Sequence, residues 1–369
     1  MPSPVTFPFP IPAFGVCPFP VPLSLLLPNL YAVKRWLLTA ISFAAVLGVS
    51  VYAVMNGAPE GVRLRLPLQA HLLAFGAFVV EVVSRVFKLM WTGRAVGAPF
   101  SFTTSFRTSL GGDFAASITP ARVGAEPARY LILSKSGLDA SDTMVVLYLE
   151  LFLEMISIAL VALAIGLIFK SSSRSVFAMV GVVGGYATFV VGLGVIGYIL
   201  SRRNLGEEPP TWARRIRLHG RRWEIVQRWV GRVRMTVDAF KEMHFGWAAL
   251  SLVASITHVA VRFTVLPAIV YSATTARVPL APLVIWPLGI IYGAGVVPAP
   301  GGGGAVELAF RAALGKVIPT AVFASALVWW RFYTFYMYIV VGALVAGNLA
   351  LKAVRDVEDA EEELERAED

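Results

Sequence analysis

Long apolar stretches, each about the length that crosses a lipid bilayer, recur along this chain of 369 residues. A membrane-spanning helix needs roughly 20 mostly apolar residues. Because lipid offers the backbone no hydrogen-bond partners, such segments have to fold as helices. We therefore predict an all-α, polytopic membrane protein of about seven to eight transmembrane helices. The candidate spans are residues 35–55, 68–90, 144–169, 176–200, 246–271, 280–297 and 321–346.

The low content of charged residues fits this prediction. Charged residues make up 15% of the chain and hydrophobic residues 57%, whereas an average soluble domain is about 25% charged. The one cysteine, Cys17, cannot form an intramolecular disulfide, and the four histidines are scattered. No Cys/His cluster has the spacing of metal ligands and no nucleotide-binding loop is present, so we expect neither a metal nor another cofactor.

Basic residues are concentrated in the loop 201–244, which carries eleven Arg or Lys. Loops rich in these residues face the cytoplasm, so the loop and the N-terminus before Lys34 are predicted to be cytoplasmic in a multi-pass cell-membrane protein. Apolar residues recur every three or four positions through 212–241, which indicates a basic amphipathic helix on the anionic headgroups of the inner leaflet. The alternative interpretation is a solvated run of charge, and no nucleic-acid partner is expected.

Two terminal segments differ from the apolar region between them. Residues 1–30 contain nine prolines and no Lys or Arg, which predicts an extended arm in the membrane interface, or alternatively a disordered segment, rather than a helix or a signal peptide. Residues 351–369 contain nine acidic and three basic residues and form an acidic tail. The transmembrane domain is therefore predicted to cover residues 31–350. The sequence leaves the oligomeric state open.

The segment Pro298-Ala-Pro-Gly-Gly-Gly-Gly-Ala-Val-Glu-Leu-Ala-Phe-Arg311 cannot form a continuous helix. Irregular backbone at membrane depth is tolerated only where protein buries it or where it lines a wet cavity. A helix that restarts near Ala305 would point free N–H groups and a positive dipole end into the break. We predict a re-entrant hairpin here. Its candidate headgroup-binding residues are Pro300, Gly301, Gly302, Gly304, Glu307 and Arg311.

The segment from Gly111 to Arg129 has a similar pattern. In both segments a proline is followed four residues later by Gly-Ala, and then by a glutamate and an arginine. Paired Gly/Pro breaks in the two halves of a chain are typical of a transporter site near the membrane midplane. Irregular segments are expected near residues 101–120 and 298–318. Our loop count makes this internal repeat parallel, and one miscounted crossing would make it inverted. The candidate residues of the first hairpin are Pro120, Arg122, Gly124, Glu126 and Arg129.

Charged residues within apolar segments are further candidates, because each charge is costly in lipid. Glu150 and Glu154 lie one helical turn apart on one face, where they could couple to a proton or pair with Arg129 or Arg331. Arg331 lies well within the last predicted helix and needs a carboxylate or a phosphate as its partner. Two further pairs share a helix face: Glu81 with Arg85, which can pair with each other, and His258 with Arg262.

An amphiphilic anion such as a phospholipid accounts for this combination of residue types. Its phosphate needs N–H donors and arginines, because a guanidinium group forks onto phosphate oxygens. Glycine-lined breaks let the backbone approach the headgroup closely. Glu126 and Glu307 could contact a cationic headgroup, or hold the arginines in place when the site is empty. The structural alternative is that each Glu–Arg pair only fastens its own hairpin.

With these motifs, the chain resembles the lysylphosphatidylglycerol-synthase transmembrane family, also described as flippase-like membrane proteins, over roughly residues 31–350. That family's Pro-Gly-Gly-x-Gly-x-x-Glu motif matches the segment from Pro300 to Glu307, and the arginine of its last helix matches Arg331. Its Pro-Gly-Arg-x-Gly-Glu motif, followed by Arg, occurs in altered form from Pro120 to Arg129. The departures are Ala121 in place of Gly, an additional Ala125, and Glu150 and Glu154 where the family has Glu-Arg-x-x-Asp.

The resemblance implies movement of a phospholipid or a polyprenyl-phosphate-linked precursor between leaflets. Full-length synthases carry a soluble aminoacyltransferase domain after the membrane part, whereas the acidic tail of this chain is too short for one. We therefore do not expect lysyl transfer, and the chain is not expected to be an enzyme.

Three hypotheses follow. In the first, the protein is a lipid translocator in which Arg129, Arg311 and Arg331 bind phosphate. In the second, it is an intramembrane enzyme that uses Glu150 and Glu154 as acid and base on a phospholipid or polyprenyl phosphate. In the third, it is a non-transporting scaffold that recruits a partner through its basic loop. The carboxylates assigned to orienting the arginines or binding a cationic headgroup in the first hypothesis are Glu126, Glu307, Glu150 and Glu154.

Overall fold

The computed structural model describes residues 65–119, 122–169, 242–293 and 304–349, together with Gly302 and scattered positions between 181 and 238. Helices dominate these residues, and no strand occurs among them. The predicted arm, the span at 35–55, most of the span at 176–200, most of the basic loop and the acidic tail lie outside the described residues. The helices are α2 (Leu68–Ala95), α3 (Phe102–Ile118), α4 (Ala125–Ser134), α5 (Ala140–Phe169), α9 (Phe245–Arg262), α10 (Val265–Ala273), α11 (Leu280–Gly293), α12 (Ala305–Leu314), α13 (Thr320–Arg331) and the π-helix η4 (Phe332–Tyr336).

Three helical segments of the described part are long and apolar enough to cross a membrane. They are Ala140–Phe169, Phe245–Ala273 and Thr320–Leu349, and they coincide with three of the predicted spans. The shorter apolar helix α11 has Pro287 in its interior. Helix α2 has 28 residues, which at 1.5 Å per residue gives a length of roughly 42 Å. The helix is continuous, but buried charged residues interrupt its apolar sequence. A membrane protein is thus evident, whereas a total of seven to eight spans stays a prediction.

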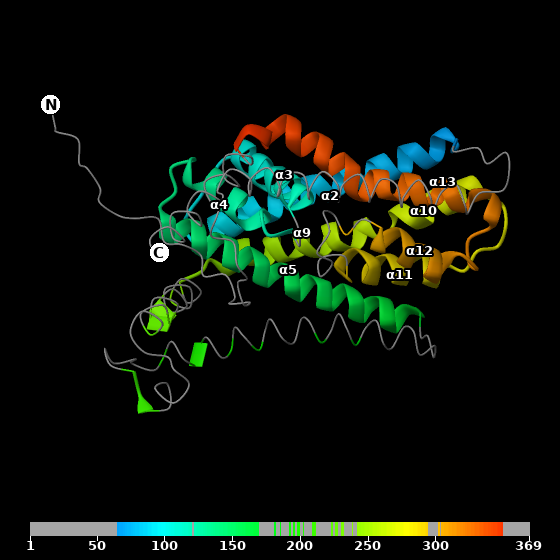
Figure 1. Cartoon of the computed structure of the whole chain (residues 1–369). Helices are drawn as coiled ribbons and strands as arrows, with labels where there is room; N and C mark the ends of the chain where they lie inside the picture. The colour runs from blue at the N-terminus through cyan, green and yellow to red at the C-terminus, as the bar shows by residue number, and fades with distance from the viewer. Residues whose placement is uncertain are drawn as a thin grey trace, which may run out of the picture.

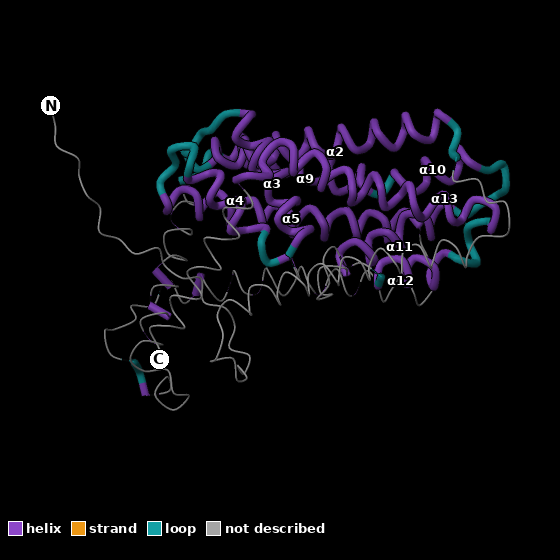
Figure 2. The backbone as a smooth tube through the Cα atoms, turned by 45° about the horizontal axis from the view of Figure 1, so that its top comes forward, coloured by secondary structure: helices purple, strands orange, loops and turns teal. Residues whose placement is uncertain are grey.

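The helices run lengthwise along an elongated bundle (Figures 1 and 2). Helices α2, α5 and α9 extend through it, and α2 packs most extensively on α9. Helices α3 and α4 form a hairpin at one end of the bundle. Helices α11 and α12 lie towards the other end (Figures 1 and 2). The two broken segments therefore belong to hairpins at opposite ends, with the long helices passing between both.

The first hairpin corrects the expectation of an irregular segment near residues 101–120, because most of it is the 17-residue helix α3. The Ser101 hydroxyl accepts the Thr104 N–H at 3.1 Å and caps the start of this helix. The break itself is short, and within it Arg122 has a left-handed backbone with φ 62°. Thr119 closes the break, since its hydroxyl accepts the Gly124 N–H at 3.0 Å.

The second hairpin restarts as predicted, with α12 beginning at Ala305. The residues before it include Gly302 with φ 65° and Gly304 with φ 78°. These left-handed conformations are accessible to glycine without the steric penalty of a side chain. Gly302 and Gly304 therefore let the backbone turn before α12.

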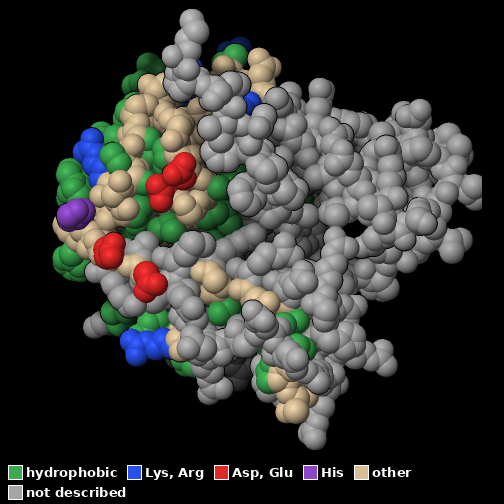
Figure 3. Space-filling model, turned by 90° about the vertical axis from the view of Figure 1, so that its left-hand side faces the viewer, with side chains coloured by type: hydrophobic (Ala, Val, Ile, Leu, Met, Phe, Trp, Pro, Cys, Tyr) green, Lys and Arg blue, Asp and Glu red, His purple; other side chains and the backbone are tan. Residues whose placement is uncertain are grey.

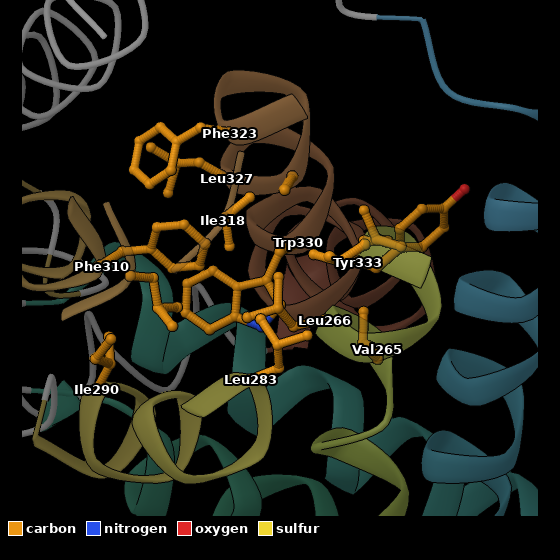
Figure 4. Close-up of a cluster of buried hydrophobic side chains, with 14 of the residues drawn as sticks. Val265, Leu266, Leu283, Ile290, Phe310, Ile318, Phe323, Leu327, Trp330 and Tyr333 are labelled. Atoms are coloured by element: carbon orange, nitrogen blue, oxygen red, sulfur yellow. The ribbon is translucent and has the colours of Figure 1, made fainter. Parts of the chain in front are cut away.

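The largest apolar cluster lies at the α10–α13 end of the bundle, where α10, α11, α12 and α13 converge (Figure 4). The rings of Phe310 and Trp330 lie 5.0 Å apart at its centre. Tyr333 points out of the cluster, and its hydroxyl lies 3.0 Å from the imidazole of His71 on α2 (Figure 4). This packing fixes α12 and α13 relative to each other and to α2.

The opposite end of the molecule, where α3 and α4 lie, carries charged side chains of both signs among hydrophobic ones (Figure 3). Of the scattered positions in the predicted basic helix, Trp223 and Val230 are helical and buried. Both belong to its predicted apolar face. The amphipathic helix as a whole stays a prediction, because most of it is outside the described residues.

Candidate functional site

An open cavity lies where the two hairpins meet. The first hairpin lines it with the end of α3 and with the break, and the second with the end of α11 and the start of α12. The remaining lining comes from α9, α13 and the π-helix, with one residue from the helical turn that follows. In chain order the lining residues are Asp113, Ala116, Ser117, Arg122, Arg262, Ile291, Val306, Arg331, Thr334, Phe335 and Tyr338.

Three arginines and one carboxylate give this cavity an excess of positive charge. Arg122, Arg262 and Arg331 line it together with Asp113. The side chain of Arg122 is 46% exposed, and its Nη2 lies 3.9 Å from an oxygen of Asp113. Asp113 also accepts two hydrogen bonds from Arg85, one of them at 3.0 Å. Asp113 is therefore shared between two arginines, and the lining attracts anions.

Glu307, in the second hairpin, holds Arg331 of α13 in place. One of its carboxylate oxygens accepts the Arg331 Nε–H at 2.9 Å, and the other accepts the Gly304 N–H at 2.8 Å. Glu307 is only 2% exposed. The carboxylate thus caps α12 and orients Arg331 at the same time, while the Arg331 guanidinium lies 4.5 Å from the ring centre of Phe335.

A second buried cluster of charges joins α2, α4 and α5. Lys88 is 1% exposed and pairs with both Glu150 and Glu154, with 2.6 Å to the latter. Arg129 pairs with Glu150 and, at 3.1 Å, with Glu126. Of the alternatives that the sequence left open for Glu150 and Glu154, the structure has the ion pair of Glu150 with Arg129, whereas Glu154 pairs with Lys88. None of these five residues belongs to the cavity lining.

The remaining candidates are distributed differently. Arg311 is exposed on α12 and is outside the cavity lining, whereas Glu307, four residues before it, faces Arg331 instead. Gly124 is buried beside Thr119, where an added Cβ would lie 2.8 Å from a side-chain carbon. Gly302 turns the backbone before α12. Three candidates lie outside the described residues: Pro120, Pro300 and Gly301.

Asp113 is a cavity residue that sequence reasoning did not select, whereas Arg262 was singled out as an intramembrane charge but not assigned to headgroup binding. Asp113 stood within the first repeated motif, directly after Gly111 and Gly112 in the sequence, but its partner Arg85 is 28 positions away. The expected pairing of Glu81 with Arg85 is not what the structure has, because Arg262 lies 3.2 Å from Glu81. Helical spacing identifies residues on one face, whereas the helix packed on that face decides the partner.

Taken together, the bundle and its cavity define an all-helical membrane protein with charged groups gathered in its interior. Comparison with protein families agrees with this class: the model of the lysylphosphatidylglycerol synthase TM region matches residues 35–342. The chain belongs to this family. A search of curated proteins gave no match. Membership links the protein to the handling of membrane lipids, and the match covers the transmembrane region.

Proposed function

We propose that this protein moves a phospholipid or a polyprenyl-phosphate-linked precursor between the leaflets of the cell membrane. The observation that carries the proposal is the cavity in which the ends of both broken hairpins meet around three arginines. Each hairpin would re-enter the membrane from its own side, so that the breaks approach the midplane. Broken helices whose ends meet at the midplane are the usual binding elements of transporters.

The lipid phosphate would bind to Arg122, Arg262 and Arg331. Guanidinium groups form paired, charge-assisted hydrogen bonds with phosphate oxygens. Arg331 is already oriented by Glu307, so little conformational freedom is lost when it binds. The more exposed Arg122 is on a short turn and can follow the headgroup. In this assignment, Glu307 orients an arginine and does not contact the lipid.

The buried cluster of Lys88, Glu150 and Glu154 would have a different task. Both carboxylates are paired with a cation, and Glu150 is paired with two. This arrangement supports a structural role for them over the alternative role of acid and base in an enzyme, which would require a carboxyl group free to exchange its proton. The translocator is therefore favoured over the intramembrane enzyme.

Leaflet exchange of labelled phospholipids in proteoliposomes tests the proposal. We expect the Arg122→Ala/Arg331→Ala variant to exchange lipid at least about tenfold more slowly than the wild type, because each lost charge-assisted bond costs about 1.5–3 kcal/mol. Arg311→Ala is the matched control, since it removes an exposed arginine of α12 outside the cavity, and its rate should stay within about twofold of wild type. Wild-type exchange by the double variant would overturn the proposed site.

A parallel assay with a labelled polyprenyl-phosphate-linked lipid distinguishes the two substrate classes. The class that exchanges in the wild type and fails in the double variant is the substrate. Exchange of neither lipid would favour the scaffold, in which the basic loop 201–244 recruits a partner. Its predicted cytoplasmic position and that of the N-terminus are tested by protease access in right-side-out and inverted vesicles.

A further inference from the structure

Helices α2 and α9 share a seam of polar residues in the interior of the bundle. The residues of each helix follow the same spacing of four, three and four, and all are buried or nearly so. The hydroxyls of Thr92 and Ser251 lie 2.8 Å apart, and at the other end of the seam Glu81 lies 3.2 Å from Arg262. The seam comprises Glu81, Arg85, Lys88 and Thr92 on α2 and Ser251, Ser255, His258 and Arg262 on α9.

This antiparallel register places His258 level with Arg85, in the middle of the seam. His258 is 1% exposed, and neither of its ring nitrogens has a hydrogen-bond partner among the described residues. The buried hydroxyls of Ser255 and Tyr292 are likewise without partners in the described part. Buried polar groups are normally satisfied by protein or by ordered water. The surroundings of His258 are thus suited to water, which can carry a proton to the imidazole.

Charged groups of both signs from neighbouring helices lie around this part of the seam. The cations Lys88, Arg85 and Arg262 oppose protonation of the imidazole, and the carboxylate of Glu150 favours it. The ion pairs bring in further partners, so that four acids face four bases when His258 is neutral. These groups are Glu81, Arg85 and Lys88 on α2, Asp113 on α3, Arg129 on α4, Glu150 and Glu154 on α5, and Arg262 on α9, with the phenols of Tyr292 and Tyr338 alongside.

The cavity is connected to the seam through Arg262, which belongs to both. Arg122, Arg331 and Glu307 add one net positive charge at the cavity. An anionic headgroup would neutralise this charge beside Arg262, which lies one helical turn from His258 on α9. At an effective dielectric constant of about 20, a charge about 10 Å from a titrating group changes its affinity for a proton by about tenfold.

We propose that His258 is a proton-binding site whose occupancy is coupled to an anionic headgroup in the cavity, so that lipid and proton bind together. This inference rests on the proposed function. The imidazole takes up a proton from water in the seam, becomes imidazolium and releases the proton again when the headgroup leaves. By linkage, the headgroup strengthens proton binding and the proton strengthens headgroup binding by the same factor.

Nitrogen-15 NMR of the detergent-solubilised protein, labelled at histidine, tests this coupling directly. The chain has four histidines, so the signal lost in His258→Gln identifies His258. We expect the midpoint of its titration to rise by about one pH unit, a tenfold change, on addition of short-chain phosphatidylglycerol, and to stay unchanged on addition of an uncharged diacylglycerol. A signal that does not titrate, or one that the anionic lipid does not move, would overturn the inference.

The pH dependence of lipid exchange provides a second readout. Exchange by the wild type should depend on pH through the titration of His258, whereas exchange by His258→Gln should not. His244→Gln is the control, because His244 is exposed before α9 and its removal should preserve the pH dependence. If His258→Gln keeps the pH profile of the wild type, while the Arg122→Ala/Arg331→Ala variant loses lipid exchange as expected, the proton site is rejected and the proposed function stands. Absence of any exchange would reject the function, and the NMR titration would still decide the proton site.

Discussion

Lys88 shows how a charge is accommodated inside this bundle. It is 1% exposed, and its ammonium group pairs with two carboxylates of α5. An uncompensated charge in such a place carries a large desolvation penalty, whereas a paired and hydrogen-bonded one does not. Because Arg129 supplies a second positive charge beside Lys88, the two negative charges of Glu150 and Glu154 are both compensated. At this scale, each buried charge of the α2, α4 and α5 contact depends on its partners.

Removing Lys88 should therefore destabilise the protein strongly. We expect Lys88→Met to lose about 3–5 kcal/mol of unfolding free energy, because it leaves carboxylate charge buried without its partner. Thermal unfolding in detergent, followed by tryptophan fluorescence, measures the change. Lys135→Met removes an exposed lysine after α4 and should stay within about 0.5 kcal/mol of the wild type. Equal melting temperatures for the two variants would contradict the role of the ion pairs.

The turn before α12 depends on glycine at Gly304, where φ is 78°. Gly304→Ala should cost about 1–2 kcal/mol, because a Cβ clashes with the carbonyl in the left-handed region. Gly76→Ala is the comparison: Gly76 is in the helix α2 with open space around it, and alanine there should be neutral or slightly stabilising. Unfolding in detergent compares the two. A cost at Gly76 as large as that at Gly304 would contradict this explanation.

At the scale of elements, α3 is a helix that its polar composition does not predict. It contains polar residues throughout, but its hydroxyls satisfy backbone carbonyls, as Thr108 does with Thr104 and Ser105 with Val86 of α2. Residues of this type favour turns and caps in an isolated chain. Packing against α2 and α4 reverses that preference, which is why the sequence suggested irregular backbone where the structure has a helix.

The contact of α3 with the last helical segment depends on a small residue. A Cβ at Gly342 would overlap the carbonyl oxygen of Leu110 and approach Phe114 to 2.9 Å. Gly342→Ala should therefore cost about 1–3 kcal/mol through overpacking. Gly347→Ala, one turn further along the same helix, meets its nearest neighbour only at 3.8 Å and should be tolerated. Similar stability of the two variants would show that the helices separate easily at this contact.

At the scale of the whole molecule, the two hairpins lie at opposite ends of the bundle (Figures 1 and 2). Our loop count from the sequence made the repeat parallel, whereas this arrangement fits the inverted alternative. In an inverted repeat, the connection after α4 and the connection after α12 face opposite sides of the membrane.

Thiol labelling tests this arrangement. In a Cys17→Ser background, Lys135→Cys and Lys316→Cys place one thiol each in the exposed connections after α4 and α12. A membrane-impermeant maleimide applied to sealed, oriented vesicles should label one variant from outside and the other only after permeabilisation. Labelling of both from the same side would contradict the inverted arrangement.

The sequence by itself determined where the described apolar helices lie and where helix α12 restarts. These are local properties: a run of apolar residues sets a span, and consecutive glycines after proline end a helix. Only the tertiary structure decided which charges meet. The pairs Arg85–Asp113 and Arg331–Glu307 join residues 28 and 24 positions apart, and Lys88–Glu154 joins residues 66 positions apart. Helical periodicity fixes the face on which a charge lies, but the packing of a distant helix on that face supplies its partner, and the cavity exists only where two such hairpins meet.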